Sequence, residues 1–244
     1  MNEIIRKRKS IRKYDFSPLD DDTLKIINEK IGSLKPLYPD IRFSVEIVNK
    51  TKGLFNVKAP YYLIFGSEEK DGSNENIGYI GQQMSLFFTE TGLGSCWLGA
   101  ARPGDKDPED KEESALPFVI CMAFGKPGEP LHRDISEFKR KTLREISDGT
   151  DERLEAARLA PSAMNAQNWY FTAMDGKLHC YRKKANPLVG FIYNKMHCVD
   201  MGIALCHIAE ESGDFHFSKE TGLPERKGYV YTGTVSGAVN SQHV

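Results

Sequence analysis

Residues 159–171 read LAPSAMNAQNWYF, and this stretch decides how the rest of the chain is interpreted. An amphipathic segment leads into it, with Leu154, Ala157 and Ala160 three residues apart on one helical face. Pro161 ends this predicted helix, because proline disfavours helical geometry in the residue before it. The polar residues that follow carry neutral groups that donate and accept hydrogen bonds. Such a loop suits a flat heterocycle, or, in a simpler interpretation, its polar groups cap the local backbone.

Residues 160–169, APSAMNAQNW, resemble the Ala-Pro-Ser-x-x-Asn-x-Gln-x-Trp signature of the nitroreductase family of flavoproteins. Family members usually have proline before the tryptophan, where this chain has Asn168. The resemblance implies that the loop reaches over the isoalloxazine ring of an FMN that is bound mainly by the other subunit. By this resemblance the cofactor contacts in the loop would be Pro161, Ser162, Ala163 and Asn165.

The composition excludes several classes of protein. With 244 residues and a net charge of −1, the chain has no electrostatic tendency toward nucleic acid or anionic membranes. Its five cysteines include no Cys-x-x-Cys pair, which favours free thiols in a reducing compartment. No signal peptide and no apolar run long enough to cross a bilayer are evident. We therefore expect a soluble, cytoplasmic protein, and the resemblance implies a small-molecule substrate.

The N-terminal region contains a basic run, RKSIR at residues 8–12. Arg8, Lys9, Ser10 and Arg12 could form a phosphate clamp, because arginine makes bidentate charge-assisted bonds to phosphate oxygens. A solvated basic face is the alternative. The run also resembles the amino-terminal Arg-x-Ser-x-Arg motif of the nitroreductase family. That resemblance implies that Arg8 and Ser10 contact the FMN phosphate and ribityl chain, and that Arg12 lies near the pyrimidine end of the flavin.

Hydrophobic periodicity and turn residues predict the other elements of the first half. Ser17 and Pro18 are expected to open a helix that closes at Gly32. A second helix is predicted from the apolar pattern that starts at Asn76, and it stops at Gly92. Strands are expected at residues 42–48, 59–65 and 117–124, a charged solvated loop at 105–113, and a linker at 128–136.

Residues 92–100, GLGSCWLGA, follow the second predicted helix. They resemble the family segment whose backbone N–H approaches the flavin N5 atom, which implicates Leu98 and Gly99. The alternative is a buried strand between two glycine turns. Both interpretations can hold, because a backbone contact requires only small side chains nearby. Trp97 is expected to be a core residue rather than a ligand contact.

The second half repeats the pattern of the first. RKTLR at residues 140–144 repeats RKSIR, and residues 199–213 repeat residues 78–92 with the same helix-end chemistry. The predicted strand at 229–235 likewise repeats the one at 118–124. We therefore predict an internal duplication, with an N-terminal half at 1–133 and a C-terminal half at 134–244. Arg140 has a second interpretation, because Lys139-Arg140-Lys141 resembles the basic C-terminal segment of family members that returns to the FMN phosphate.

The expected fold class is α+β and nitroreductase-like, with mixed or antiparallel sheets packed against helices. Family nitroreductases are homodimers with FMN at the interface, so two trimmed tandem halves would form a pseudo-dimer within one chain. The chain itself would then be a monomer or a homodimer. The second, mirror site lacks a Ser-x-x-Asn loop near Lys35 and has Asp214-Phe215 where a glycine turn is needed. One complete site per chain is therefore expected.

The resemblance implies an FMN-dependent oxidoreductase that passes electrons from NAD(P)H to a nitroaromatic or quinone-type acceptor in ping-pong order. The flavin carries this chemistry, so no catalytic side chain is expected. Arg12 or Lys9 would stabilise the anionic reduced ring. Two alternatives stay open: a non-catalytic flavin-binding or sensing protein, and a flavin enzyme with other chemistry such as dehalogenation or flavin fragmentation.

Two His-Cys pairs, at 197–198 and at 206–207 in the reverse order, raise the question of a metal site. Their spacing is unlike any structural zinc motif. The helix that carries them needs Val199, Ile203 and Cys206 for its apolar face. We therefore expect these residues to pack in the core, and we predict no metal site.

Overall fold

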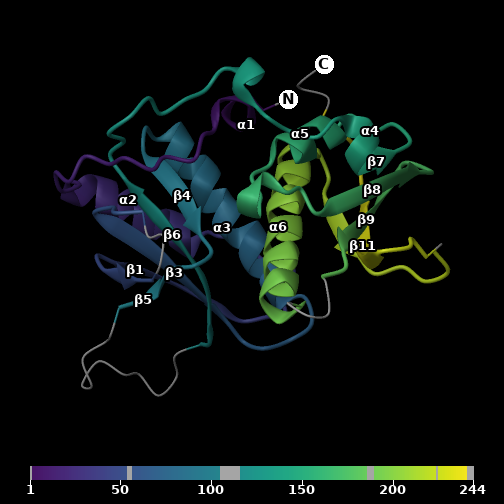
Figure 1. Ribbon diagram of the computed structural model, residues 1–244, viewed down its shortest axis with the longest axis horizontal. Coiled ribbons are helices and arrows are strands. Elements are labelled where there is room, and N and C mark those ends of the chain that lie inside the picture. The colour runs from purple at the N-terminus through teal and green to yellow at the C-terminus, as the bar shows by residue number, and fades with distance from the viewer. Residues whose placement is uncertain (1, 54–56, 105–115, 186–189, 224, 241–244) are drawn as a thin grey trace.

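The computed structural model describes residues 2–53, 57–104, 116–185, 190–223 and 225–240. Two long helices, α3 (Ser73–Glu90) and α6 (Gly190–Glu210), lie side by side in the middle of the molecule, with one sheet on each side (Figure 1). The predicted charged loop at 105–113 lies outside the described residues. The fold is α+β, as expected from the sequence.

Each half of the chain contributes one sheet. The first sheet has the strand order β1-β3-β6-β4, and all neighbours are antiparallel. Its strands are β1 (Phe43–Val48), β3 (Tyr61–Ser67), β4 (Gly94–Leu98) and β6 (Phe118–Gly125). The second sheet has the order β10-β11-β9-β8-β7, and only the β7–β8 pair is parallel. Its strands are β7 (Ser147–Asp148), β8 (Trp169–Met174), β9 (Lys177–Lys183), β10 (His216–Ser218) and β11 (Tyr229–Ser236).

The shorter elements surround these sheets. The remaining helices are α1 (Glu3–Lys7), α2 (Asp21–Gly32), α4 (Leu143–Ile146) and α5 (Leu154–Leu159), with single 3-10 turns η2 (Ile135–Glu137) and η3 (Ala163–Asn165). Two short strands, β2 (Thr51–Lys52) and β5 (Arg102–Pro103), pair with each other. The α2 cap differs from our prediction. Asp20 caps it by accepting the Thr23 N–H at 2.7 Å, whereas Ser17 bonds back to Asp15.

The two halves have the same arrangement of elements. Apart from the two-residue strand β7, the second sheet reads β8-β9-β11-β10, which matches β1-β3-β6-β4 strand for strand along the chain. In each half a helix precedes the first strand, and the long helix follows the second strand. The antiparallel pairing expected from the sequence is therefore present in both halves. The duplication and the boundary at residue 133 stay predictions.

The central helices cross at a pair of glycines. A Cβ on Gly78 would lie 2.1 Å from the Val199 carbonyl oxygen, and one on Gly202 would lie 1.9 Å from the Glu75 carbonyl oxygen. The two contacted residues occupy the same position on their helices: Glu75 lies three residues before Gly78, and Val199 lies three residues before Gly202. In this reciprocal contact Gly78 and Gly202 occupy matching positions. The repeat seen in the sequence pairs Gly81 with Gly202 instead, so the two alignments of the helices differ by three residues.

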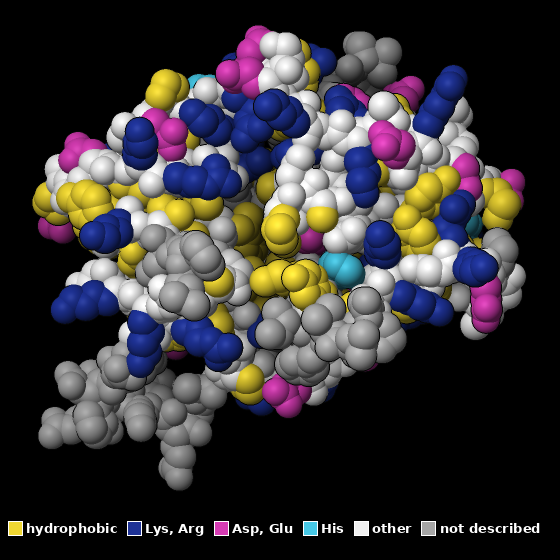
Figure 2. Space-filling model, in the orientation of Figure 1, with side chains coloured by type: hydrophobic (Ala, Val, Ile, Leu, Met, Phe, Trp, Pro, Cys, Tyr) yellow, Lys and Arg dark blue, Asp and Glu magenta, His cyan; other side chains and the backbone are white. Residues whose placement is uncertain are grey.

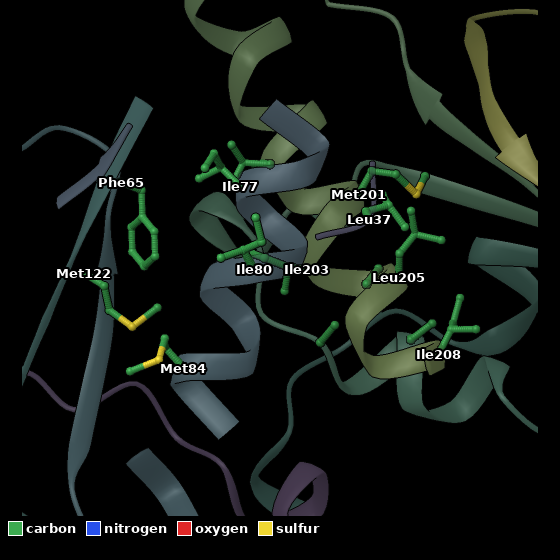
Figure 3. Close-up of a cluster of buried hydrophobic side chains, with 14 of the residues drawn as sticks. Leu37, Phe65, Ile77, Ile80, Met84, Met122, Met201, Ile203, Leu205 and Ile208 are labelled. Carbon is green, nitrogen blue, oxygen red and sulfur yellow. The ribbon is translucent and has the colours of Figure 1, made fainter. Parts of the chain in front are cut away.

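Both halves contribute apolar side chains to one shared core cluster (Figure 3), and a smaller cluster around Ile11, Tyr62 and Cys121 belongs to the first half alone. Phe65 and Met122 of the first sheet face α3, which presents Ile77, Ile80 and Met84 between the sheet and α6. On α6 the buried residues include Met201, Ile203, Leu205 and Ile208. Separation of the halves would expose this surface to water, at a cost of about 25 cal/mol for each Å².

Candidate functional site

A cavity of about 890 Å³ lies between the two halves. Figure 2 shows a hollow near the middle of the face that it draws, with hydrophobic side chains inside and Lys and Arg side chains gathered above it. The first half lines the cavity with Ser10, Arg12, Cys96, Trp97, Gly99, Ala100 and Ile120. The second half lines it with Pro161, Ser162, Ala163, Met164, Gly190, Tyr193, Met196, Val199, Asp200 and Ile203. A mostly apolar space of this size can hold a drug-sized planar molecule.

The basic run reaches the cavity by pairing with β4. Ser10 forms a parallel bridge with Ser95, and the Ile11 N–H donates to the Ser95 carbonyl oxygen at 2.9 Å. Gly94 makes this approach possible, because a Cβ at that position would lie 2.8 Å from the Ile11 side chain. Ser10 and Arg12 therefore face the cavity on either side of the buried Ile11.

The loop after α5 forms the opposite wall and has a strained backbone. Met164, Asn165 and Gln167 have φ values of 52°, 56° and 46°, in the left-handed region that non-glycine residues rarely adopt. Hydrogen bonds hold this conformation: Ser162 Oγ accepts the Gln167 N–H at 2.9 Å, and Gln167 Nε2 donates to the Arg158 carbonyl oxygen at 2.9 Å. The capping interpretation is therefore correct for Gln167. Strain of this kind is common at functional sites.

Several predicted contact residues lie outside the cavity wall. Asn165 accepts a hydrogen bond from the Arg140 guanidinium and donates to the Lys139 carbonyl oxygen, so it ties the loop to that basic segment. Lys9 donates to the Pro130 carbonyl oxygen and pairs with Glu129. The side chains of Arg8 and Leu98 are buried. The predicted residues that the structure brings together around the cavity are Ser10, Arg12, Gly99, Pro161, Ser162 and Ala163.

Beside the cavity, three arginines gather, and none of them is seen in an ion pair among the described residues, although the charge of Glu137 lies close enough to Arg133 to oppose the lowering of its pKa by burial. Arg8 is 1% exposed, yet its Nε and Nη2 have no hydrogen-bond partner among the described residues, and the Nε atoms of Arg133 and Arg140 have none either. Burial, followed by the charges of Arg133 and Arg140, lowers the pKa of Arg8 to about 9. Burial also lowers the pKa of Arg140 to about 10. We call Arg8, Arg133 and Arg140 the arginine cluster. Its unpaired buried donors fit an anion such as a phosphate.

A family model described as "Putative TM nitroreductase" matches residues 1–212. The chain belongs to this nitroreductase family. The fold agrees with it: a putative nitroreductase from Thermotoga maritima superposes with a TM-score of 0.62 at 19% identity, covering 96% of this chain and 90% of that one. No curated protein sequence matches the chain.

Other solved nitroreductases match only part of the chain. A putative NADH dehydrogenase/NAD(P)H nitroreductase from Bacteroides thetaiotaomicron has a TM-score of 0.45 at 16% identity and covers 59% of this chain and 94% of its own. An FMN-dependent nitroreductase from Clostridium difficile R20291 has a TM-score of 0.40 at 17% identity, with coverages of 56% and 93%. Similarity at this level supports no inference about the cofactor of the present chain.

Two polar residues of this nitroreductase's site, Arg133 and Asp200, were not predicted from the sequence. Arg133 fell in the predicted linker, but its backbone N–H donates to the Lys7 carbonyl oxygen and its guanidinium stacks 4.6 Å from the Phe138 ring centroid. Asp200 is 3% exposed and lines the cavity. The signal for Asp200 was present, because it is a lone carboxylate in the apolar run CVDMGIALC at 198–206. Trp97 has both expected and unexpected roles, since it packs against Phe65 and also lines the cavity.

The histidines of α6 have local partners. His197 Nε2 contacts Asn168 Nδ2 at 2.9 Å, and His207 Nε2 contacts Gln82 Nε2 at 2.8 Å. Burial lowers the pKa of His207 to about 3, so this imidazole is neutral. Within the part of the chain that the structure describes, no group of three His, Cys, Asp or Glu residues could hold a metal ion. In the same part, none of the helices combines the length and apolar character needed to cross a bilayer.

Proposed function

We propose that this nitroreductase is an FMN-dependent oxidoreductase that passes electrons from NAD(P)H to a nitroaromatic or quinone-type acceptor in ping-pong order. The observation that carries the proposal is the position of the arginine cluster beside a mostly apolar cavity. FMN needs both features, because it joins a phosphate to a flat conjugated ring. Ser10 and Arg12 connect the two, since they line the cavity and belong to the same short segment as Arg8.

The residues present fit this cofactor. The cluster offers unpaired guanidinium donors that a phosphate would satisfy. Gly99 keeps the cavity wide, because a Cβ there would lie 2.9 Å from the Met196 Cε atom. The loop from Pro161 to Ala163 forms the other wall, so a flat ring would lie between residues of the two halves. This supports the contacts that the resemblance implies for Ser10, Arg12, Gly99 and the loop.

When bound, FMN would supply the redox chemistry by accepting a hydride and passing electrons on. The chain would bind and orient its ligands. Arg12 places a positive charge on the cavity wall, where it would stabilise negative charge on a reduced ring. Trp97, Ile120 and Met196 give the cavity apolar walls that exclude water and suit a second aromatic molecule.

We further propose that the chain is a pseudo-dimer with one FMN site, formed by duplication of a half. The matching strand orders and the reciprocal crossing at Gly78 and Gly202 support the duplication. The mirror loop lacks the signature: Leu37 and Tyr38 occupy it, and their N–H groups donate to Asn76 Oδ1. The monomeric or homodimeric state and the cytoplasmic location stay predictions.

The proposal is tested by NADH or NADPH oxidation in the presence of FMN, with menadione or a nitrofuran as acceptor. We expect turnover by the full-length chain, and we expect the Arg8→Met variant to need about tenfold to a hundredfold more FMN for half-maximal turnover. Arg6→Met, which changes an exposed arginine two residues away, should behave like the parent chain. Tight FMN binding without turnover by any acceptor would instead favour the flavin-binding or sensing alternative. Absence of FMN binding would contradict both.

A further inference from the structure

Asp200 is a buried carboxyl group on the wall of the proposed flavin cavity. Its Oδ1 accepts the Ala163 N–H at 2.9 Å, so it holds the loop that forms the opposite part of the wall. Its Oδ2 is buried and has no hydrogen-bond partner among the described residues. A buried carboxyl oxygen without a partner is costly, and at a cavity wall a bound ligand can satisfy it.

The pseudo-symmetry of the fold supplies a comparison within the same chain. Asn76 lies two residues before Gly78, as Asp200 lies two residues before Gly202. Asn76 Oδ1 accepts the N–H groups of Leu37 and Tyr38 at 2.7 and 3.0 Å, in the loop that corresponds to the one held by Asp200. An amide is therefore sufficient to anchor such a loop. The second side-chain atom of each residue, Asn76 Nδ2 and Asp200 Oδ2, is buried without a partner among the described residues. The difference is that Asp200 lines the cavity and Asn76 does not, so a ligand in the cavity is a candidate partner for Asp200 alone.

We propose that Asp200 is a hydrogen-bond donor of the cavity: one carboxyl oxygen holds Ala163, and the other, carrying a proton, bonds to a carbonyl oxygen or ring nitrogen of a bound planar ligand. The inference rests on the proposed function for the kind of ligand, since flavins and quinones both present such acceptor atoms. A neutral carboxyl can donate to them, whereas a carboxylate can only accept.

The surroundings of Asp200 favour the protonated form. Burial raises the pKa of Asp200 to about 7, although the bond from Ala163 opposes this. The titratable residues just before it on its own helix are Cys198 and His197. Burial raises the pKa of the Cys198 thiol. His197 bonds to Asn168 and to the Lys183 carbonyl oxygen, and burial lowers its pKa.

Charged and titratable groups also lie on the other elements around Asp200. On α3, Glu75 faces Arg182 at 3.6 Å. Across the cavity lie Arg12 and Cys96, and burial raises the pKa of the Cys96 thiol. The described loop residues 161–164 carry no titratable side chain. None of these groups pairs with Asp200 Oδ2.

The proposal predicts a pH-dependent affinity. If the ligand binds only when Asp200 carries its proton, the dissociation constant should rise about thirtyfold between about pH 5.5 and about pH 8.5. Riboflavin is the first probe, because it has the ring but no phosphate and so reports on the cavity separately from the arginine cluster. Fluorescence quenching of riboflavin by the flavin-free full-length chain measures its affinity.

The matched variant is Asp200→Asn. Its amide keeps an oxygen for Ala163, as the Asn76 oxygen serves Leu37 and Tyr38, and it offers an N–H in place of the O–H. We expect its affinity for riboflavin to match that of the parent chain at about pH 5.5 and to change less than about twofold up to about pH 8.5. Asp71→Asn, which removes a carboxylate that is exposed and pairs with Lys219, should keep the pH dependence of the parent.

A second arm identifies which planar ligand Asp200 contacts. Menadione binding to the FMN-loaded chain is followed by difference absorption over the same pH range. A pH dependence that Asp200→Asn removes in the riboflavin arm places the bond on the flavin ring, and one found only in the menadione arm places it on the acceptor. A flat profile in both arms, or an unchanged pH dependence in Asp200→Asn, would overturn the inference. Failure of riboflavin and FMN to bind at any pH would contradict the proposed function instead.

Discussion

Replacement of Arg8 by methionine should stabilise the chain in the absence of anions. Arg8 is 1% exposed, and its guanidinium has unpaired donors and two neighbouring arginines. The fall in its pKa to about 9 corresponds to a penalty of about 5 kcal/mol on the charged form in the folded state. This is an upper limit for the gain in Arg8→Met, because the variant also loses the packing of the guanidinium. A buried charge can be replaced by an apolar side chain of similar length with a net gain in stability.

The assay is urea-induced unfolding with and without inorganic phosphate or pyrophosphate. The parent chain should gain about 2.7 kcal/mol when the anion is present at about 100 times its dissociation constant. Arg8→Met should be more stable than the parent without the anion and should gain little from it. Arg6→Met should behave like the parent in both conditions, since Arg6 is exposed.

The reasoning would be refuted by an Arg8→Met variant that is less stable than the parent without anions and still gains stability from phosphate. That result would mean that Arg8 is satisfied within the folded chain and that the arginine cluster is not an anion site. An Arg8→Met variant that is less stable than the parent and gains no stability from phosphate would contradict the magnitude argued from burial. It would leave the arginine cluster in place as the anion site.

Three further predictions concern packing and protonation. Gly78→Ala should lower the melting temperature, because the added Cβ would force α3 away from α6. Gly32→Ala should not lower it, because the space around Gly32 is open. Thermal melts followed by circular dichroism measure both melting temperatures. Between about pH 4 and about pH 7 the folded parent keeps a proton on Asp200 that the unfolded chain releases, so its unfolding free energy should fall by up to about 4 kcal/mol as pH rises. Asp200→Asn should remove this fall, and urea titrations across the range measure it. Residues 1–133 and 134–244, expressed separately, should give no cooperative melt because their core is shared.

The position of the site could be predicted from local sequence, because its main signals are local. Pro161 follows directly on a helix end, as its effect on the preceding residue predicts, and of the left-handed residues after it only Asn165 is of a type that tolerates this backbone readily. Gly99 and the alternation of Ser10 and Arg12 around Ile11 likewise follow from short-range pattern. These residues do line the cavity.

The direction of individual side chains could not be predicted, because it depends on segments far apart in the chain. Asn165 turns to Arg140 because residues 139–141 lie beside the loop, and no pattern in the sequence reports that proximity. Arg8 is buried because its segment pairs with β4 and with His132. The α2 cap was missed for a different reason: Ser17 and Asp20 are both good caps, but Ser17 bonds to Asp15 and Asp20 caps the helix.

The central claim is that the two halves together form one FMN site. Calorimetric titration of FMN into the flavin-free full-length chain, with flavin counted per chain from the absorption spectrum, tests it most directly. We predict one FMN per chain, bound between about tenfold and a hundredfold more weakly by Arg8→Met, as expected for the loss of a charge-assisted phosphate contact. Two tightly bound flavins per chain, or none, would contradict the account.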